Sequence, residues 1–302
     1  KKLNYDLVGV ATRNLSNRNS FFKDHKIKKK FIGYKELLKD KDINYIYIPL
    51  PNTLHLKWCL EAVKKNKNVL CEKPLCLKSK DVKKIIKATK GKNIIVAEAI
   101  MYRHNLLIKK LKKILNSNNF GEIIKIKSNF FRDYNLNQKN IRFEKELGGG
   151  SLYDLGYYSI SLINFLFNSK PKKFIGKRII KKGVDVKFYG KILYTGNKIG
   201  EFCSSFIDKK NDQTVIYCEK AKISIPSTFF RGQKKIIIES KNSKKILYAN
   251  DRVHRYQKQI ENIVLSSKKI VGKEVGLDET LKNVYCMEMV EKSSQKGKII
   301  LV

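Results

Sequence analysis

The first hundred residues alternate short apolar runs with longer segments in which apolar side chains recur at three- and four-residue intervals. Short apolar runs predict buried strands, and the three-and-four spacing predicts helices. The predicted strands are DLVGVAT (6–12), INYIYIPL (43–50), NVLCEKP (68–74) and NIIVAEA (93–99), and the clearest helices cover 53–67 and 79–90. Strands joined by single helices make right-handed crossovers, so this part predicts a doubly wound parallel sheet.

The pattern changes after residue 105. A helix is predicted at 106–117, an alternating antiparallel strand at 123–134, and a glycine turn that leads into a helix at 146–167. Further strands are predicted at 171–179, 185–195, 198–207, 212–227 and 234–240, and helices at 255–267 and 279–297. Strands grouped after an α/β unit predict a second, α+β domain with an open, mainly antiparallel sheet. We therefore divide the chain into domains 1–102 and 103–302.

The chain has 302 residues and a formal net charge of +38, with its lysines spread along the whole length beside abundant Ile and Asn. A genome rich in A and T produces the same excess, and no RNA or DNA motif is present, so nucleic-acid binding ranks last. The sequence contains neither a run of 18 apolar residues nor a signal peptide, which argues against a membrane partner. Six cysteines without a C-x-x-C pair indicate reduced thiols in a cytoplasmic protein and no metal site.

Polar motifs follow three of the first four predicted strands: ATRN, PLPNTLH and CEKP. Ligands bind doubly wound sheets at this carboxyl edge. Such sheets usually begin with a strand and G-x-G-x-x-G, which this sequence lacks, so it opens on what corresponds to the second strand. Two explanations stay open: the chain begins inside a longer protein, or the gene is truncated. Thr12 and Arg13 suit a ribose 2′-phosphate and favour NADP over NAD, unless Arg13 is simply a solvated cation.

Several motifs together resemble the Gfo/Idh/MocA family of NAD(P)-dependent oxidoreductases. They are YIYIPLPNTLHLKWCLEAVKKNKNVLCEKPLCL, VAEAIMYRHN, FGEI, NIRFEKELGGGSLYDLGYYSISLINFLF and SSQKGKIILV. The resemblance is strongest to its glucose-fructose oxidoreductase, xylose dehydrogenase and dihydrodiol dehydrogenase group. It implies a Rossmann domain followed by a domain that binds substrate and forms a homodimer or homotetramer through its open sheet. It also implies hydride transfer between a nicotinamide and a hydroxyl-bearing carbon of a sugar or cyclic polyol, or reduction of the matching carbonyl.

The resemblance also assigns site residues. Lys73 matches the active-site lysine, and Asp154 and Tyr158 match the acid and the proton-transferring residue of D-x-G-x-(H/Y). Arg103 is a weaker match. The cofactor contacts that we predict are Thr12, Arg13, Leu50, Asn52, His55, Glu72, Lys73 and Arg142. The Lys73-Pro74 peptide bond is expected to be cis.

An alcohol dehydrogenase also needs a group that takes the hydroxyl proton. Tyrosine is a weak acid at neutral pH, and a nearby ammonium such as Lys73 is expected to lower its pKa. Asp154 and Tyr158 are four residues apart and share one helix face. We predict Tyr158 as the proton-transfer residue with Lys73 as its electrostatic partner, and the reverse assignment stays open.

Less specific interpretations accompany these assignments. Tyr157 competes with Tyr158 for the same role, His55 can be a packing residue at a helix start, and GGG can be only a flexible turn. A non-catalytic, cofactor- or sugar-binding member of the family is the alternative function, because the glycine loop is absent while Lys73, Asp154 and Tyr158 are present.

Overall fold

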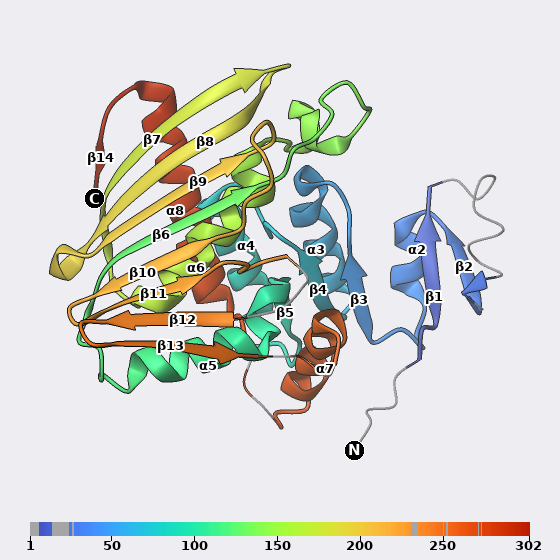
Figure 1. Cartoon of the computed structure of the whole chain (residues 1–302). Coiled ribbons are helices and arrows are strands. Elements are labelled where there is room, and N and C mark those ends of the chain that lie inside the picture. The colour runs from blue at the N-terminus through green and yellow to red at the C-terminus, as the bar shows by residue number, and fades with distance from the viewer. Residues whose placement is uncertain are drawn as a thin grey trace.

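The computed structural model describes residues 6–13, 24–25, 27–230, 235–249, 251, 253–270, 272 and 274–302. The amino-terminal part contains parallel strands linked by helices (Figure 1). Its strands are β1 (Gly9–Thr12), β2 (Lys29–Ile32), β3 (Tyr45–Ile48), β4 (Asn68–Glu72) and β5 (Val96–Ala99). Its helices are α2 (Tyr34–Lys39), α3 (His55–Lys64) and α4 (Ser79–Thr89), with the 3-10 turns η1 (Asn52–Leu54) and η2 (Met101–His104). All four predicted strands are confirmed. β2 (KKFI) is as long as β1, β3 and β5 but begins with two lysines and so shows no apolar run, and the six residues of α2 are too few to show a helical period.

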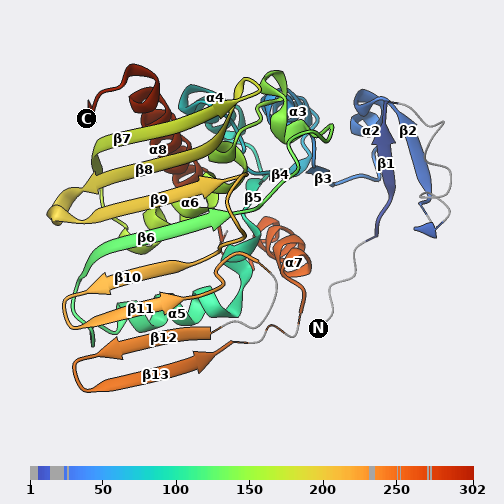
Figure 2. The same ribbon diagram turned by 45° about the horizontal axis from the view of Figure 1, so that its top comes forward.

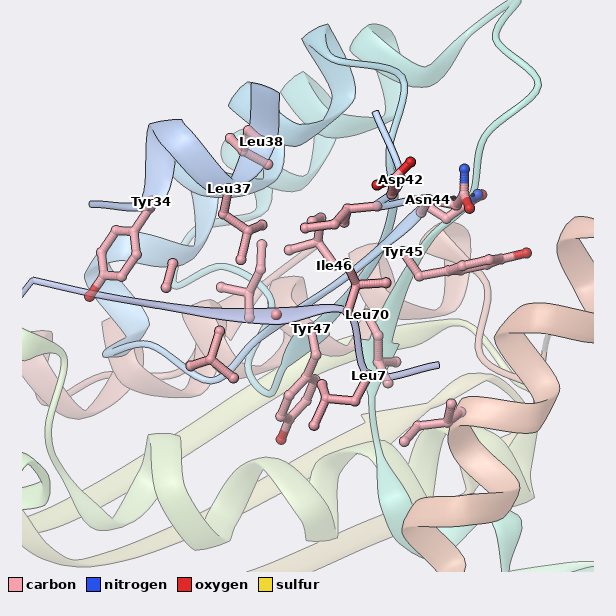
Figure 3. A pocket seen from close by; sticks show the side chains of 18 of the residues that line it. Leu7, Tyr34, Leu37, Leu38, Asp42, Asn44, Tyr45, Ile46, Tyr47 and Leu70 are labelled. Carbon is pink, nitrogen blue, oxygen red and sulfur yellow. Dashed lines mark hydrogen bonds between the residues drawn. The ribbon is translucent and has the colours of Figure 1, made fainter. Parts of the chain in front are cut away.

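The parallel sheet is interrupted, which corrects the expectation of one continuous sheet. β1 pairs with β2, and β3, β4 and β5 pair with one another, but within the described residues no ladder joins β1 to β3. A cavity of about 1850 Å³ separates them, and Tyr45, Ile46, Tyr47 and Leu70 line one side of it (Figure 3). Paired strands lie only about 4.8 Å apart, so strands on opposite sides of this cavity cannot bond. In the usual strand order 3-2-1-4-5-6, this position belongs to the strand with the glycine loop.

The second sheet is larger and confirms the predicted open, mainly antiparallel architecture. Its order is β13 (Ser243–Tyr248), β12 (Lys235–Ser240), β11 (Ala221–Ile225), β10 (Thr214–Cys218), β6 (Ile123–Phe131), β9 (Ile199–Ser205), β8 (Val184–Tyr194), β7 (Pro171–Lys181) and β14 (Ile300–Leu301). In the described part of the chain, β6 and β9 are the only neighbours in it that run parallel. The predicted strand 212–227 is instead the hairpin β10–β11, and β13 was not predicted. Residue 234, in the predicted strand 234–240, lies outside the described residues.

Helices cover one face of this sheet (Figures 1 and 2). They include α6 (Tyr157–Phe167) and α8 (Leu277–Lys296), and α5 (Leu106–Asn116) lies near the β12 edge. Along β8 buried and less buried residues alternate, as expected for a strand with one covered face. The core contains the stacked rings of Phe188 and Phe202.

The end of the chain returns to the first sheet. In α7 (Arg255–Ser267), Ile263 and Val264 pack against Leu70 of β4 and Ala99 of β5. The division into 1–102 and 103–302 therefore describes the order along the sequence, while α7 belongs in space to the parallel strands. No helix within the described residues is long and apolar enough to cross a membrane.

Candidate active site

Lys73 follows β4 directly and points toward the helix that carries Asp154. Its side chain is only 9% exposed. The Nζ atom donates to the main-chain oxygen of Asp154 at 2.6 Å and to Asp154 Oδ1 at 3.0 Å. The same atom lies 4.7 Å from the centre of the Tyr158 ring. The Lys73-Pro74 peptide bond is cis, as predicted.

The GGG turn is a close-packed entry to this helix and more than a flexible turn. Gly150 has φ +124°, and a Cβ there would overlap Oδ1 of Asp185. A Cβ on Gly149 would lie 2.5 Å from the carbonyl oxygen of Arg142. Side chains at these positions would therefore push the turn away from both neighbours.

The helix begins with a π-helical turn, η5 (Leu152–Gly156), and continues as α6. The backbone N–H of Tyr157 bonds the carbonyl of Leu152, five residues earlier. π-Turns are rare and occur often at functional sites. Asp154 and Tyr158 both contact Lys73, which confirms that they lie on the same side of the helix.

The Asp154 carboxylate lies between two cations. Arg142, in the 3-10 turn η3 (Ile141–Phe143), donates from Nε to Asp154 Oδ2 at 2.7 Å. Burial raises the pKa of Asp154, but Lys73 and Arg142 outweigh it, and the net pKa is lowered. Asp154 is therefore ionised at neutral pH and acts on Lys73 through its charge.

Tyr158 lies in an aromatic environment. Its ring centre is 5.5 Å from those of Phe130 and Phe229 and 6.0 Å from that of Tyr102. Burial, followed by the charges of Glu72 and Asp154, raises the pKa of Tyr158 well above its usual value. The prediction that Lys73 lowers this pKa is wrong in this structure, because the ammonium is paired with Asp154 and lies over the ring face.

Tyr157, the competing tyrosine, points elsewhere. It is fully buried, and its hydroxyl donates to Glu98 Oε2 at 2.8 Å. Arg103 is also distant from the chemistry, because it is buried against Glu279 and lies over the Phe165 ring. The contact with Lys73 therefore favours Tyr158 over Tyr157 as the candidate proton-transfer residue.

Two predicted cofactor residues hold the loops around Lys73. Asn52 donates from Nδ2 to the Gly148 carbonyl at 2.8 Å, which ties η1 to the GGG turn. The ring nitrogens of His55 lie 2.8 Å and 2.7 Å from the carbonyl oxygens of Pro74 and Leu50. Burial lowers the pKa of His55, although both carbonyls oppose that shift. Because each ring nitrogen faces a main-chain carbonyl, His55 contacts both loops, which favours its interpretation as a packing residue.

The remaining predicted contacts fall into two places. Glu72 lies beside Lys73, and its Oε1 accepts the Tyr47 hydroxyl at 2.6 Å. Thr12, Arg13 and Leu50 line the cavity between β1 and β3, whereas Lys73, Asp154 and Tyr158 do not. The structure therefore gathers Lys73, Asp154, Tyr158 and Arg142 into one cluster and does not place Thr12 and Arg13 with them.

Two buried acids at this site did not emerge from the sequence. Glu98 accepts from Tyr157, and Asp185 Oδ2 accepts the Ser151 hydroxyl at 2.6 Å and the Leu152 N–H at 2.8 Å. A lone acid within an apolar strand, as in VAEA and GVDVKF, was the available signal, because acids are rarely buried unless they are paired.

Family models match both parts of the chain. Residues 1–99 match the oxidoreductase family with an NAD-binding Rossmann fold, and residues 108–224 match the GFO/IDH/MocA C-terminal domain. A trans-1,2-dihydrobenzene-1,2-diol dehydrogenase of Xenopus laevis is 30% identical over 244 residues, which is 80% of this chain and 73% of that protein. The chain belongs to the GFO/IDH/MocA oxidoreductase family.

Other members extend this comparison. A D-xylose 1-dehydrogenase (NADP(+)) of Haloferax volcanii is 26% identical over 203 residues, covering 67% of this chain and 62% of that protein. The crystal structure of an aldose-aldose oxidoreductase from Caulobacter crescentus, complexed with glycerol, superposes with a TM-score of 0.89. It is 16% identical and covers 98% of this chain and 92% of that chain, so it supports the fold.

The residues fit the family's nicotinamide cofactor in part. Thr12 and Arg13, on the wall of the cavity between β1 and β3, offer a hydroxyl and a cation. Lys73 after β4 and Arg142 in η3 supply positive charge near Asp154. A G-x-G-x-x-G turn for the pyrophosphate does not occur in the sequence. Among the described residues, no group of three or more His, Cys, Asp or Glu could hold a metal ion.

Proposed function

We propose that this protein transfers a hydride between NADP and a hydroxyl-bearing carbon of a sugar or cyclic polyol, or reduces the matching carbonyl. One observation carries the proposal. An ammonium, a carboxylate and a phenol from segments 81 residues apart meet at the carboxyl end of β4. The relatives named above as diol, xylose and aldose enzymes support this substrate class.

The protein's own part in this reaction is to manage the proton. The cofactor, when bound, supplies or accepts the hydride. The Tyr158 phenol is protonated at neutral pH and can donate its proton to a carbonyl oxygen in the reductive direction; its raised pKa makes it a weaker acid, so this step depends on the positive charge of Lys73 nearby. Lys73 stabilises the negative charge that develops on that oxygen, and Asp154 holds its ammonium in place. In the reverse assignment, Lys73 transfers the proton and Tyr158 positions the substrate.

Kinetics of two variants test the proposal. Lys73→Ala and Tyr158→Phe should each lower kcat by about 100-fold or more, since proton transfer contributes about 10²–10⁴-fold, with little change in cofactor affinity. Exposed residues provide matched controls: Lys83→Ala and Tyr248→Phe should keep full turnover. Near-normal turnover in both site variants would refute the assignment.

We propose NADP over NAD because Thr12 and Arg13 end β1 on the cavity wall. A guanidinium can pair with a 2′-phosphate, whereas the acid usually found at this strand end of NAD sites is replaced here. Arg13→Ala should lower kcat/KM for NADPH and leave that for NADH unchanged. An equal effect on both cofactors would contradict the preference.

A second candidate is a non-catalytic cofactor- or sugar-binding protein. In this candidate the cavity between β1 and β3 is the ligand site and the protein has no turnover. Trp58, the only tryptophan, lines this cavity and lies 4.9 Å from the ring of Tyr34. Titration with NADPH should therefore quench its fluorescence if the cavity takes the nucleotide. Quenching without turnover on any sugar or polyol would select the binding protein.

We also propose a homodimer or homotetramer formed through the open sheet. On the face opposite the helices, Glu201 is surrounded by Lys125, Lys127 and Lys191. Paired charges of this kind can remain at an interface, where free lysines would repel. Light scattering after gel filtration tests the assembly, and a monomer would contradict it.

We propose a cytoplasmic location, because the six free thiols suit a reducing compartment. Small molecules rather than nucleic acids are the expected ligands.

A further inference from the structure

Glu98 is a buried acid that the proposed chemistry does not use. It lies in β5 and is 2% exposed. Its Oε1 accepts the Leu75 N–H at 2.7 Å, and its Oε2 accepts the hydroxyls of Tyr157 at 2.8 Å and Thr280 at 3.1 Å. A carboxylate is buried at a cost, and three donors that converge on it offset part of that cost.

The three donors come from three separate elements. Leu75 lies two residues after Lys73 in the turn that follows β4. Tyr157 begins α6 and immediately precedes Tyr158. Thr280 belongs to α8, which carries none of the proposed catalytic side chains. Glu98 therefore joins the lysine turn to the tyrosine helix through one rigid strand.

The surroundings of Glu98 oppose its charge, and its three hydrogen bonds offset part of that effect. Burial raises the pKa of Glu98 to about 7, and the nearby charge of Glu279 adds to this rise, whereas the three hydrogen bonds lower it. Each of those bonds favours the carboxylate, which is the form that can accept from all three donors. In a buried setting a hydrogen bond to a charged group contributes more than one between neutral groups.

We propose that Glu98 is a positioning residue, which sets the distance and direction between Lys73 and Tyr158 by holding Leu75 and Tyr157 at once. This inference rests on the proposed function. Displacements of about 1 Å in a catalytic group can cost about 100-fold in rate, so a tie between the two elements is expected to act on kcat. It should leave KM for the cofactor unchanged, because Glu98 is buried away from solvent.

Two substitutions that each remove one hydroxyl group separate this role from general support. Tyr157→Phe removes the bond from Glu98 to α6, while Thr280→Val removes the bond to α8 and keeps the link between the catalytic elements. Tyr157→Phe should lower kcat about 10- to 100-fold with KM unchanged, and Thr280→Val should change kcat by less than about twofold. The kcat of Glu98→Gln should lie between those of wild type and Glu98→Ala, because the amide oxygen still accepts a hydrogen bond. The rates are compared only for variants that circular dichroism shows to be folded.

The outcomes separate this inference from the proposed function. If wild type turns over a sugar or polyol while Tyr157→Phe and Thr280→Val have equal kcat, the positioning role is overturned and the function stands. If wild type has no turnover, the function fails, and crystal structures of the two variants then decide the inference. Glu98 keeps its role if the separation of Lys73 Nζ from the centre of the Tyr158 ring, 4.7 Å in this structure, changes in Tyr157→Phe alone, and loses it if the separation is the same in both variants.

Discussion

Replacing Asp154 by asparagine should expose how much this structure depends on one buried charge. The carboxylate accepts from Lys73 at 3.0 Å and from Arg142 at 2.7 Å, and its side chain is 18% exposed. Asparagine keeps the shape and one acceptor oxygen. Its amide nitrogen, however, would meet one of the two cationic donors, and the charge that separates them would be gone.

The two contacts contribute unequally because they differ in exposure. Lys73 is 9% exposed, so its charge-assisted bond with Asp154 is estimated at about 1.5–3 kcal/mol. Arg142 is 36% exposed, and solvent screening reduces its pair to about 0–1 kcal/mol. We therefore expect Asp154→Asn to lower the free energy of unfolding by roughly 1.5–4 kcal/mol, which overlaps the lower part of the range of about 3–5 kcal/mol for losing one partner of a buried pair.

Urea denaturation at pH 7, followed by circular dichroism, measures this difference. The pKa of Asp154 is lowered in the fold, so its stabilisation is complete above the ordinary pKa of an aspartate and is lost as pH falls through the lowered value. The difference in the free energy of unfolding between wild type and Asp154→Asn should therefore disappear at acid pH. Asp42→Asn is the control, because Asp42 is 72% exposed and its partner Lys29 keeps a second bond to Asp40. A loss below about 1 kcal/mol in Asp154→Asn, with normal kcat, would refute this reasoning.

Two further predictions concern the turn before the catalytic helix. Burial raises the pKa of Asp185 to about 6 from its ordinary 3.8, so wild-type stability should fall by on the order of 2–3 kcal/mol as pH rises from about 4 to about 6. Asp185→Asn should lack this slope in urea titrations, and a parallel slope in both proteins would contradict the burial argument. Gly150→Ala should lower the melting temperature far more than Gly91→Ala, since Gly150 faces Asp185 whereas Gly91, also at positive φ, has open space around it. Equal melting temperatures of the two variants would contradict this prediction, because they would mean that the GGG turn can shift to make room for a Cβ at residue 150.

The sequence by itself determined the features that depend on local periodicity. The parallel strands, the helix after GGG and the shared face of Asp154 and Tyr158 follow from spacing along a few residues. The motif around Lys73 also indicated the family, and it singled out the lysine that we propose as catalytic. Three features gave no such signal. β2 begins with two lysines and so lacks an apolar run, and α2 has only six residues, too few for a helical period. The turn that divides 212–227 into two strands interrupts no apolar pattern.

Only the tertiary structure decided the properties that depend on distant neighbours. Lys73 meets Asp154 across 81 residues of sequence, and its ammonium lies over the Tyr158 ring while paired with that carboxylate. Burial then raises the Tyr158 pKa, which is opposite to the sequence-based expectation. The roles of Glu98 and Asp185 likewise arise from donors on other elements. Desolvation and pairing depend on what surrounds a side chain in three dimensions, and spacing along the chain does not encode that environment.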